Sequence, residues 1–204
     1  VRTTSREQCV KHTDGMSVLL VDIRDAVGHG LTITPIATMM NHASTELFFE
    51  DLRVPARNLI GVAGQGFKCI LDGLNAERIL IAAECIGDAR WFIARATDYA
   101  RERKVFDRPI GANQAIQFPI ARAHIQTEAA ALMVQHAVDL YDAGRPAGTQ
   151  ANMAKLLASE ASWAAADMCV QTHGGYGFAT EYDIERKFRE TRLYQVAPIS
   201  TNLI

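Results

Sequence analysis

The chain has 204 residues, 49% of them hydrophobic, and this length is sufficient for one sizeable core or about one and a half domains. Its formal net charge of -2 argues against a nucleic-acid or anionic-membrane partner, because binding either one requires a broad positive field. The longest apolar runs, such as residues 19–23, are far too short to span a bilayer. We therefore expect a protein without a membrane span and without nucleic acid as a partner.

The cysteines and histidines indicate neither a disulfide framework nor a metal site. Four cysteines lie far apart with no CxxC pair, which is typical of buried thiols in a reducing compartment. The six histidines lack the spacing of metal ligands, so no metal is predicted. No secretory or transit segment is visible, and we expect a cytoplasmic location. The question of an organellar transit peptide stays open, because the chain starts at Val1 and we expect the true N-terminus to be missing.

Up to about residue 58, the signals are those of strands. An apolar run follows the turn pair Asp14-Gly15, and two later segments are rich in β-branched or aromatic residues. Prolines 35 and 55 are expected at strand edges or ends. Residues 1–60 are therefore predicted to be part of an antiparallel β domain. The predicted strands cover residues 16–23, 31–39 and 44–49.

The apolar period changes from 2 to 3.6 near Gly61, and this is the only domain boundary that the pattern predicts. Glycine and proline signals separate several helical segments, and Thr149 is the expected N-cap of the third. Long helices joined by short loops predict an antiparallel four-helix-type bundle over residues 61–204. The predicted fold class is mainly α with an N-terminal β segment. The predicted helices cover residues 67–101, 114–143, 149–173 and 183–196.

Glu77 is the first candidate for chemistry. It falls on a helical row with Ile70, Leu74 and Ile81, which places a carboxylate on an otherwise apolar stripe. Burial disfavours the charged form of a carboxyl group and raises its pKa, which makes it a better general base near neutral pH. The alternative is a buried glutamate paired with an arginine of another helix, and the pattern alone favours this structural role. Glu84, one heptad further on, shares the stripe and is the rival carboxylate.

Two further segments could hold a phosphate. Residues 101–108 carry several basic side chains at a helix C-terminus, where such residues usually only complement the helix dipole. Arginines followed by Asn113 and Gln114 around one turn could also grip a pyrophosphate. Residues 171–178, Gln-Thr-His-Gly-Gly-Tyr-Gly-Phe, place bare backbone N–H groups where they could meet a phosphate, or form only a C-cap and a tight turn. This string is neither a Walker A loop nor a dinucleotide fingerprint.

Taken in order, six strings resemble the acyl-CoA dehydrogenase family, and the similarity covers essentially the whole chain. The Gln-x-x-Gly-Gly-x-Gly-Phe string followed by Glu181-Tyr182 is highly specific. The resemblance implies an N-terminal helical domain, a middle β domain and a C-terminal four-helix bundle, in an FAD-binding homo-oligomer (a dimer or tetramer). This chain would contain the later part of the β domain and most of the bundle, truncated at its last helix. The strings lie at residues 49–55, 74–78, 99–106, 109–114, 171–178 and 189–195.

Carried over position by position, the resemblance implies contacts with cofactor and substrate. Arg103 resembles the family's arginine at the FAD pyrophosphate, and Arg78 matches an arginine of the substrate pocket. Val105 departs from the hydroxyl residue often found at its position, so that hydrogen bond would be missing. Further FAD contacts are matched by Phe106 and Gln114 and, in a loop that reaches FAD bound to a neighbouring subunit, by Gln171, Gly174 and Gly175.

The catalytic base departs from the family's common pattern. Many members carry a glutamate in a Tyr-Glu-Gly-Thr string after the last motif, where this chain has Pro198, which cannot accept a proton. A minority, similar to the isovaleryl- and long-chain-specific enzymes, uses a glutamate in a Leu-x-x-Glu-Arg string on the first bundle helix. Glu77 stands at that position. Pattern and resemblance together therefore favour Glu77 as the base.

The implied reaction is α,β-desaturation of an acyl-CoA thioester, in which a glutamate takes the α-proton and a hydride passes to FAD. An electron-transfer flavoprotein is the expected electron acceptor. Two alternatives stay open: a related flavin oxidase or monooxygenase, and, for this piece alone, a non-catalytic oligomerisation module. The isolated piece is expected to be inactive. The sequence does not indicate the length or branching of the acyl group.

Overall fold

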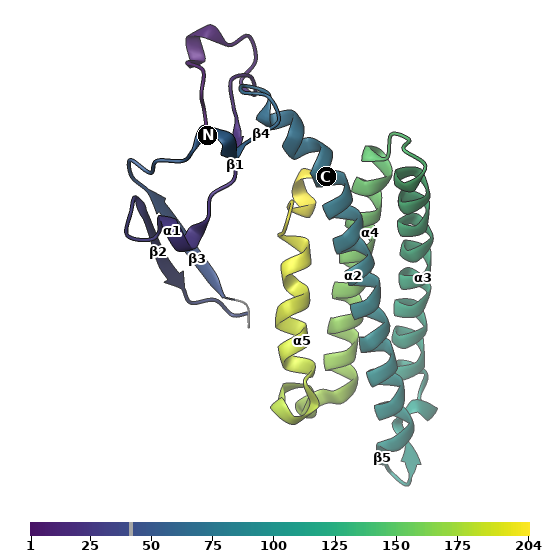
Figure 1. Cartoon of the computed structure of the whole chain (residues 1–204). Coiled ribbons are helices and arrows are strands. Elements are labelled where there is room, and N and C mark those ends of the chain that lie inside the picture. The colour runs from purple at the N-terminus through teal and green to yellow at the C-terminus, as the bar shows by residue number, and fades with distance from the viewer. Residues whose placement is uncertain (41–42) are drawn as a thin grey trace. The chain divides into compact units, whose positions relative to one another are not determined.

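The computed structural model describes residues 1–40 and 43–204, and helices dominate it (Figure 1). The chain divides into two compact units, residues 1–74 and 75–204, and the division falls within helix α2 (Gly66–Glu102). The predicted fold class, mainly α with an N-terminal β segment, is confirmed. The predicted domain boundary between residues 60 and 61 stays a prediction.

The first unit contains two short antiparallel pairings. β2 (Leu31–Ile36) pairs with β3 (Ser44–Phe49) along its whole length, close to where strands were predicted. Pro35 is tolerated there because a two-stranded sheet consists only of edge strands. β1 (Val18–Leu19) pairs with β4 (Leu59–Ile60), and these strands of 2 residues each are too short to show an alternating pattern in the sequence.

The strand predicted over residues 16–23 is wrong for most of its length. After β1, the Asp22 carboxylate accepts a hydrogen bond from the backbone N–H of Arg24 at 3.0 Å. This bond caps the short helix α1 (Ile23–Ala26), because it satisfies a backbone donor that the first helical turn leaves unpaired. The apolar run therefore ends in a helical turn.

The second unit contains an antiparallel bundle in which α2 is joined by three more helices (Figure 1). Three of the four predicted helices are confirmed nearly to their ends. The prediction that Thr149 is the N-cap of the third helix is wrong, because Ala147 occupies the cap position and Thr149 lies inside the helix. The fourth predicted helix is α-helical only in its first part and continues as a 3-10 turn over Arg192–Gln195. The added helices are α3 (Gln114–Asp142), α4 (Gly148–His173) and α5 (Ile184–Thr191).

The bundle core is built largely from small side chains. On α2, Ala82, Ala89 and Ala96 recur every seven residues and are 0% exposed. They face alanines of α4 such as Ala165, with Phe92 as the largest fully buried side chain between them. Small side chains allow helix axes to approach closely, and alanine also has the highest helix propensity. The packed face of α2 is therefore its alanine face.

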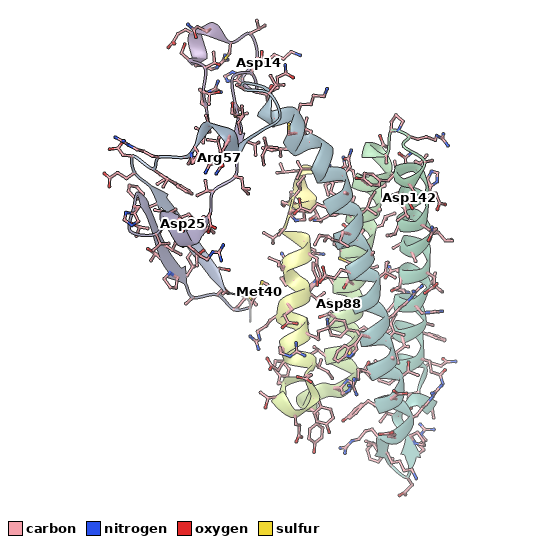
Figure 2. All side chains as sticks on the ribbon, in the orientation of Figure 1. Asp14, Asp25, Met40, Arg57, Asp88 and Asp142 are labelled. Atoms are coloured by element: carbon pink, nitrogen blue, oxygen red, sulfur yellow. The ribbon has the colours of Figure 1, made fainter. Side chains whose placement is uncertain are left out.

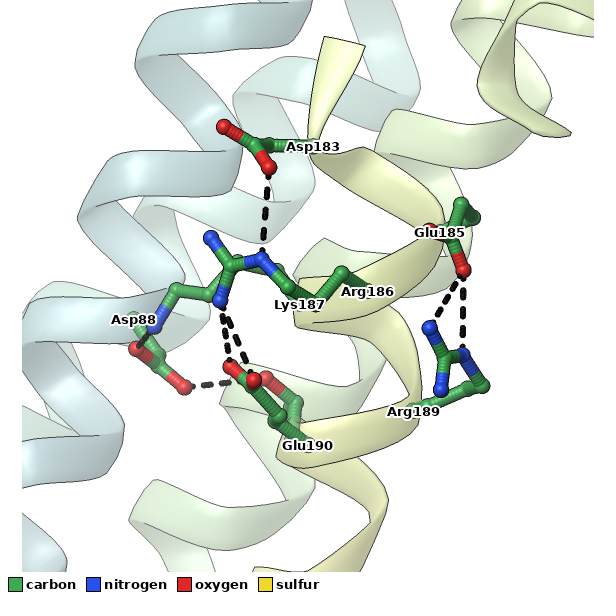
Figure 3. A network of polar contacts seen from close by, with 8 residues as sticks. Asp88, Asp183, Glu185, Arg186, Lys187, Arg189 and Glu190 are labelled. Carbon is green, nitrogen blue, oxygen red and sulfur yellow. Dashed lines mark hydrogen bonds and ion pairs between the residues drawn. The ribbon is translucent and has the colours of Figure 1, made fainter. Parts of the chain in front are cut away.

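A buried polar cluster ties α5 to α2. Asp88 of α2 is 6% exposed and forms an ion pair with Lys187 of α5 (Figure 3). Asp88 also accepts a hydrogen bond of 2.9 Å from the hydroxyl of Thr191. Figure 2 shows Asp88 among the bundle helices, near the middle of α2. These contacts hold α5, and with it the glycine-rich loop that precedes α5, against the bundle.

A small hairpin that was not predicted lies between α2 and α3. β5 (Lys104–Val105) pairs with β6 (Arg108–Pro109) through a turn in which Phe106 and Asp107 have φ of 51° and 62°. Two consecutive positive φ angles are typical of the tight turns that suit the twist of a hairpin. The basic stretch after α2 is therefore folded back and does not extend the helix.

The described part of the chain lacks two kinds of feature. None of its helices is both long and apolar enough to cross a bilayer. Within residues 1–40 and 43–204, no group of three or more histidine, cysteine, aspartate or glutamate side chains is placed to hold a metal ion.

Candidate functional site

Glu77 lies on the exposed face of α2, and the prediction that it belongs to a buried stripe is wrong. The side chain of Glu77 is exposed, and so is that of Ile70 on the same predicted row. The buried face runs instead through Ile79, Ala82 and Cys85. At 3.6 residues per turn, Glu77 and Ile79 point about 160° apart, so Glu77 points away from the helices that pack on α2.

Arg78 does not pair with Glu77. Its Nη1 donates a hydrogen bond of 3.0 Å to the side-chain oxygen of Asn75, and its Nε is buried without a hydrogen-bond partner. Among the residues that the structure describes, no hydrogen bond or ion pair engages the Glu77 side chain. Glu77 therefore does not have the alternative role of a buried glutamate in a structural ion pair.

The rival carboxylate, Glu84, is also exposed, but it has a polar neighbour. Tyr194, in the 3-10 turn after α5, packs against the bundle core, and its phenol lies near the Glu84 carboxylate. Burial and the nearby carboxylates of Asp88 and Glu84 together raise the pKa of the Tyr194 phenol far above its usual range. Glu84 thus lies beside the segment that follows α5.

Four of the predicted cofactor residues line one cavity of about 650 Å³ within the bundle unit. Arg103 comes from the end of α2, and Gln171, Gly174 and Gly175 come from the end of α4 and the loop after it. Gly174 has φ of 59°, a conformation that favours glycine, and a Cβ added at Gly174 or Gly175 would meet nothing within 4 Å. The glycine backbone is therefore accessible from the cavity.

An aromatic cluster supports one side of this cavity. The rings of Tyr99 and His173 stack with centroids 4.1 Å apart, and Tyr182 packs edge-on against both. The ring of Tyr176 lies 5.7 Å from the Arg103 guanidinium, a cation–π distance that orients the arginine toward the glycine loop. The ends of α2 and α4 are thus joined by stacked rings next to the predicted phosphate contacts.

His173 is the buried member of this cluster. It is 5% exposed, and its Nδ1 lies 2.8 Å from the backbone carbonyl of Cys169, to which it donates in the neutral tautomer. Burial lowers the pKa of His173; the Cys169 carbonyl opposes this shift and the charge of Arg95 adds to it. His173 is therefore neutral near pH 7.

The electrostatics of the cavity depend on Arg103. Both α2 and α4 end here, and a helix C-terminus carries partial negative charge, which disfavours an anion. Arg103 is exposed, and no carboxylate of the described residues forms an ion pair with it. The backbone N–H of Gly174 already donates to carbonyls of the last turn of α4, so the unpaired guanidinium is the group that fits the oxygens of a phosphate.

The other predicted cofactor residues lie outside this cavity. Phe106 is 94% exposed in the turn of the β5–β6 hairpin, and Gln114 is exposed at the first position of α3. Val105 does line the cavity, but its side chain offers no hydrogen-bonding group. Phe106 and Gln114 would reach a ligand only if it extended beyond the cavity.

Lys155 is a buried polar residue that the sequence analysis missed. It is 0% exposed in the middle of α4, and its Nζ donates a hydrogen bond of 2.6 Å to the backbone carbonyl of Ile199. Lysine is almost never fully buried, so a lysine inside a helical pattern gives no signal of this kind.

An antiparallel helical bundle with an arginine- and glycine-lined cavity at the ends of two helices defines a domain suited to a phosphate-bearing cofactor. The profile described as "Acyl-CoA dehydrogenase, C-terminal domain" matches residues 64–198 of this chain. The chain belongs to the acyl-CoA dehydrogenase family. FAD is the cofactor of this family, and the unpaired Arg103, beside the open glycine backbone, fits its pyrophosphate.

Individual relatives agree with this assignment. An acyl-CoA dehydrogenase of Mycobacterium tuberculosis is 39% identical over 188 residues, which are 91% of this chain and 48% of that protein. A subunit of the caffeyl-CoA reductase-Etf complex of Acetobacterium woodii is 35% identical over 187 residues, 91% of this chain and 49% of that protein. The structure of butyryl-CoA dehydrogenase from Megasphaera elsdenii superposes with a TM-score of 0.90 at 29% identity, over 98% of this chain and 52% of that one. The chain thus spans about half the length of these relatives.

Proposed function

We propose that this chain forms part of an FAD-dependent acyl-CoA dehydrogenase that introduces a double bond between the α and β carbons of an acyl-CoA thioester. The observation that carries the proposal is that one cavity, in a member of this family, is lined by all four of the residues Arg103, Gln171, Gly174 and Gly175. The substrate class is supported by the names of relatives, which include butyryl-CoA and caffeyl-CoA, both thioesters of coenzyme A.

In this proposal, Arg103 holds the FAD pyrophosphate and the glycine loop completes the contact. Gln171, Gly174 and Gly175 touch the same FAD molecule as Arg103, because all four line one cavity. That FAD belongs to a neighbouring subunit, so a homo-oligomer is required for a complete site. Phe106 and Gln114 add contacts where the cofactor extends beyond the cavity.

Glu77 is the proposed catalytic base. Its carboxylate takes the α-proton of the thioester, and the electron pair of that C–H bond becomes the new π bond as the β-hydride departs. FAD, when bound, supplies the acceptor for the hydride. Arg78 lies next to Glu77 and brings positive charge into the substrate pocket.

The exposure of Glu77 sets a condition on this mechanism. A carboxylate becomes a stronger base when water is excluded from it. Glu77 is exposed and unpaired within the described chain, so bound acyl-CoA or further parts of the protein must cover it during the reaction. Pro198 offers no competing carboxylate, and the Glu84 carboxylate lies beside the Tyr194 phenol.

An electron-transfer flavoprotein is the proposed acceptor of the electrons. A relative at 35% identity is named as part of a complex with such a protein, which supports this choice. Peroxide release in place of acceptor reduction would point to the oxidase or monooxygenase alternative. Colourless oligomers of the complete protein would point to an assembly module.

The test is to purify the complete protein and measure bound FAD and acyl-CoA-dependent dye reduction. A yellow protein that reduces the dye with a straight-chain or branched acyl-CoA is expected. Arg103→Gln removes a charge-assisted hydrogen bond worth about 1.5–3 kcal/mol, so FAD affinity should fall roughly 10- to 100-fold.

Arg108→Gln is the matched control for this variant. Arg108 is an exposed arginine of the hairpin that follows Arg103, but it hydrogen-bonds Asn113 at 3.1 Å and does not line the cavity. Its substitution should leave FAD affinity within about 3-fold of the original, which is less than 1 kcal/mol. Equal losses for both variants would show that the hairpin's charge, and not the cavity, attracts the cofactor.

A further inference from the structure

Lys155 places a charge-bearing group in a fully buried part of the bundle. The alanines before and after it on α4, Ala151, Ala154 and Ala158, are all 0% exposed, as is Lys155 itself. Taking an ammonium group out of water is unfavourable unless polar partners replace the lost hydration. Burial accordingly lowers the pKa of Lys155, and the neighbouring Cys85 of α2 partly opposes that shift.

The partner of Lys155 lies 44 residues away along the chain. The Nζ atom donates to the carbonyl oxygen of Ile199 at 2.6 Å, and Ile199 belongs to the segment after α5 that is defined here as residues 196–200. Two 3-10 turns flank this segment, Arg192–Gln195 before it and Thr201–Leu203 after it. It has no helix or strand ladder of its own, so its position depends on contacts with the bundle.

Two contacts tie this part of the chain to two different helices. Tyr194, just before the segment, packs on the core beside Glu84 of α2. Ile199, near its end, is held by Lys155 of α4. The segment is therefore fixed at both ends, next to the α2 face that carries Glu84. Glu77 lies on that same face, about two helical turns or 10 Å nearer the N-terminus of α2.

We infer that Lys155 is a positioning residue whose buried ammonium fixes residues 196–200 as a wall beside the α2 face that carries Glu77. The inference rests on the proposed function for its catalytic consequence, but the anchoring itself can be measured without any reaction. Because the anchored atom is a main-chain carbonyl, the position of this segment does not depend on the side chains that the segment carries. Pro198 lies one residue before the anchored carbonyl, so its ring is placed by the same contact.

The position of Lys155 separates this role from cofactor binding. Lys155 lies 18 residues before His173, and a helix rises about 1.5 Å per residue, so it is roughly 27 Å from the glycine end of α4. Loss of the anchor should therefore affect substrate turnover without affecting the Arg103 cavity.

Lys155→Met in the complete protein is the direct test. Methionine is of similar length and apolar, and replacing a buried charge by an apolar side chain often leaves a fold intact. Ser159→Ala is the matched control, because Ser159 is also 0% exposed on α4 but its hydroxyl donates to Leu156 of its own helix at 3.1 Å.

Amide hydrogen exchange measures the anchoring. In Lys155→Met, the amides of Val196 and Leu203, which close the turns around the segment, should exchange about 10-fold faster. Amides in the middle of α2 and α4 should keep their rates. Ser159→Ala should leave the exchange of the segment unchanged. Unchanged exchange of the segment in Lys155→Met would overturn the inference, whether or not the protein has dehydrogenase activity.

Turnover measures the catalytic consequence. With FAD content unchanged, kcat for the best acyl-CoA should fall about 10- to 100-fold in Lys155→Met, because a displaced wall disturbs the placement of the reacting carbon. Faster exchange of the segment together with normal kcat would refute the catalytic role. If Lys155→Met does not fold, Lys155→Gln, which retains one amide donor on a shorter side chain, goes through the same two measurements with the same criteria.

Discussion

Replacing Asp88 should be the most damaging polar substitution in the bundle. Its carboxylate is the partner of both the Lys187 ammonium and the Thr191 hydroxyl, and its side chain is 7% exposed. Asp88→Ala leaves both groups without an acceptor. Removing one partner of a buried ion pair costs about 3–5 kcal/mol. The Lys187 side chain is 22% exposed and can recover some hydration, which favours the lower end, about 3 kcal/mol.

Asp88→Asn and Glu128→Ala are the controls. Asparagine retains an oxygen that can accept from Thr191 but loses the charge, so its effect should be intermediate. Arg90 and Glu128 also join two helices, but their side chains are 56% and 45% exposed, and such pairs contribute about 0–1 kcal/mol. The two carboxylates therefore differ in burial more than in chemistry.

Urea unfolding followed by far-UV circular dichroism is the assay. With a slope of roughly 1–3 kcal/mol/M, a loss of about 3 kcal/mol lowers the midpoint by about 1 M or more. Glu128→Ala should move it by less than half of that. Equal midpoint shifts for Asp88→Ala and Glu128→Ala would refute the reasoning that burial decides the strength of these pairs.

Three further results are expected from the packing and the pKa shifts. Phe92→Ala should lower the free energy of unfolding by about 3–5 kcal/mol in the same urea assay, because Phe92 is 0% exposed in the core. Burial raises the pKa of the Cys85 thiol to about 12, so iodoacetamide at pH 8 should modify the partly exposed Cys9 but not Cys85, as read by peptide mass spectrometry. Burial also lowers the pKa of His173, so below its usual value of 6.5 the unfolded chain binds a proton that the folded chain resists. The free energy of unfolding should therefore fall as pH drops below 6.5, and His173→Gln should flatten that part of its pH profile. Identical pH profiles of the variant and the original protein would contradict the assignment of this effect to His173.

The ends of α3 and α4 could be predicted from the sequence because each of these helices ends at a strong local signal. Gly144 and Pro146 stop α3, and Gly174 stops α4 with a positive φ that few other residues adopt. Strands of two residues could not be predicted, because alternation needs a longer window. Asp22 turned a predicted strand into a helical turn through one side-chain hydrogen bond.

The orientation of α2 could not be predicted from hydrophobic spacing. Two rows compete on this helix, one with large aliphatic residues near Glu77 and one with Ala82, Ala89 and Ala96. The alanine row is the buried one, because close helix packing rewards small side chains more than hydrophobicity scales suggest. The cofactor cavity was easier to predict, since Arg103 and Gly174 belong to distinctive strings that the fold brings together.

Rapid-mixing reduction of the bound flavin tests the role of Glu77 most directly. Complete protein carrying Glu77→Gln should retain its yellow FAD and bind acyl-CoA, yet lose flavin bleaching by a factor of roughly 1000 or more, because the base that takes the α-proton is gone. Glu84→Gln, the same substitution on the same exposed face of α2, should bleach within a few-fold of the original rate. Bleaching of Glu77→Gln at a near-original rate, or an inactive Glu84→Gln in its place, would contradict the assignment of Glu77 as the base.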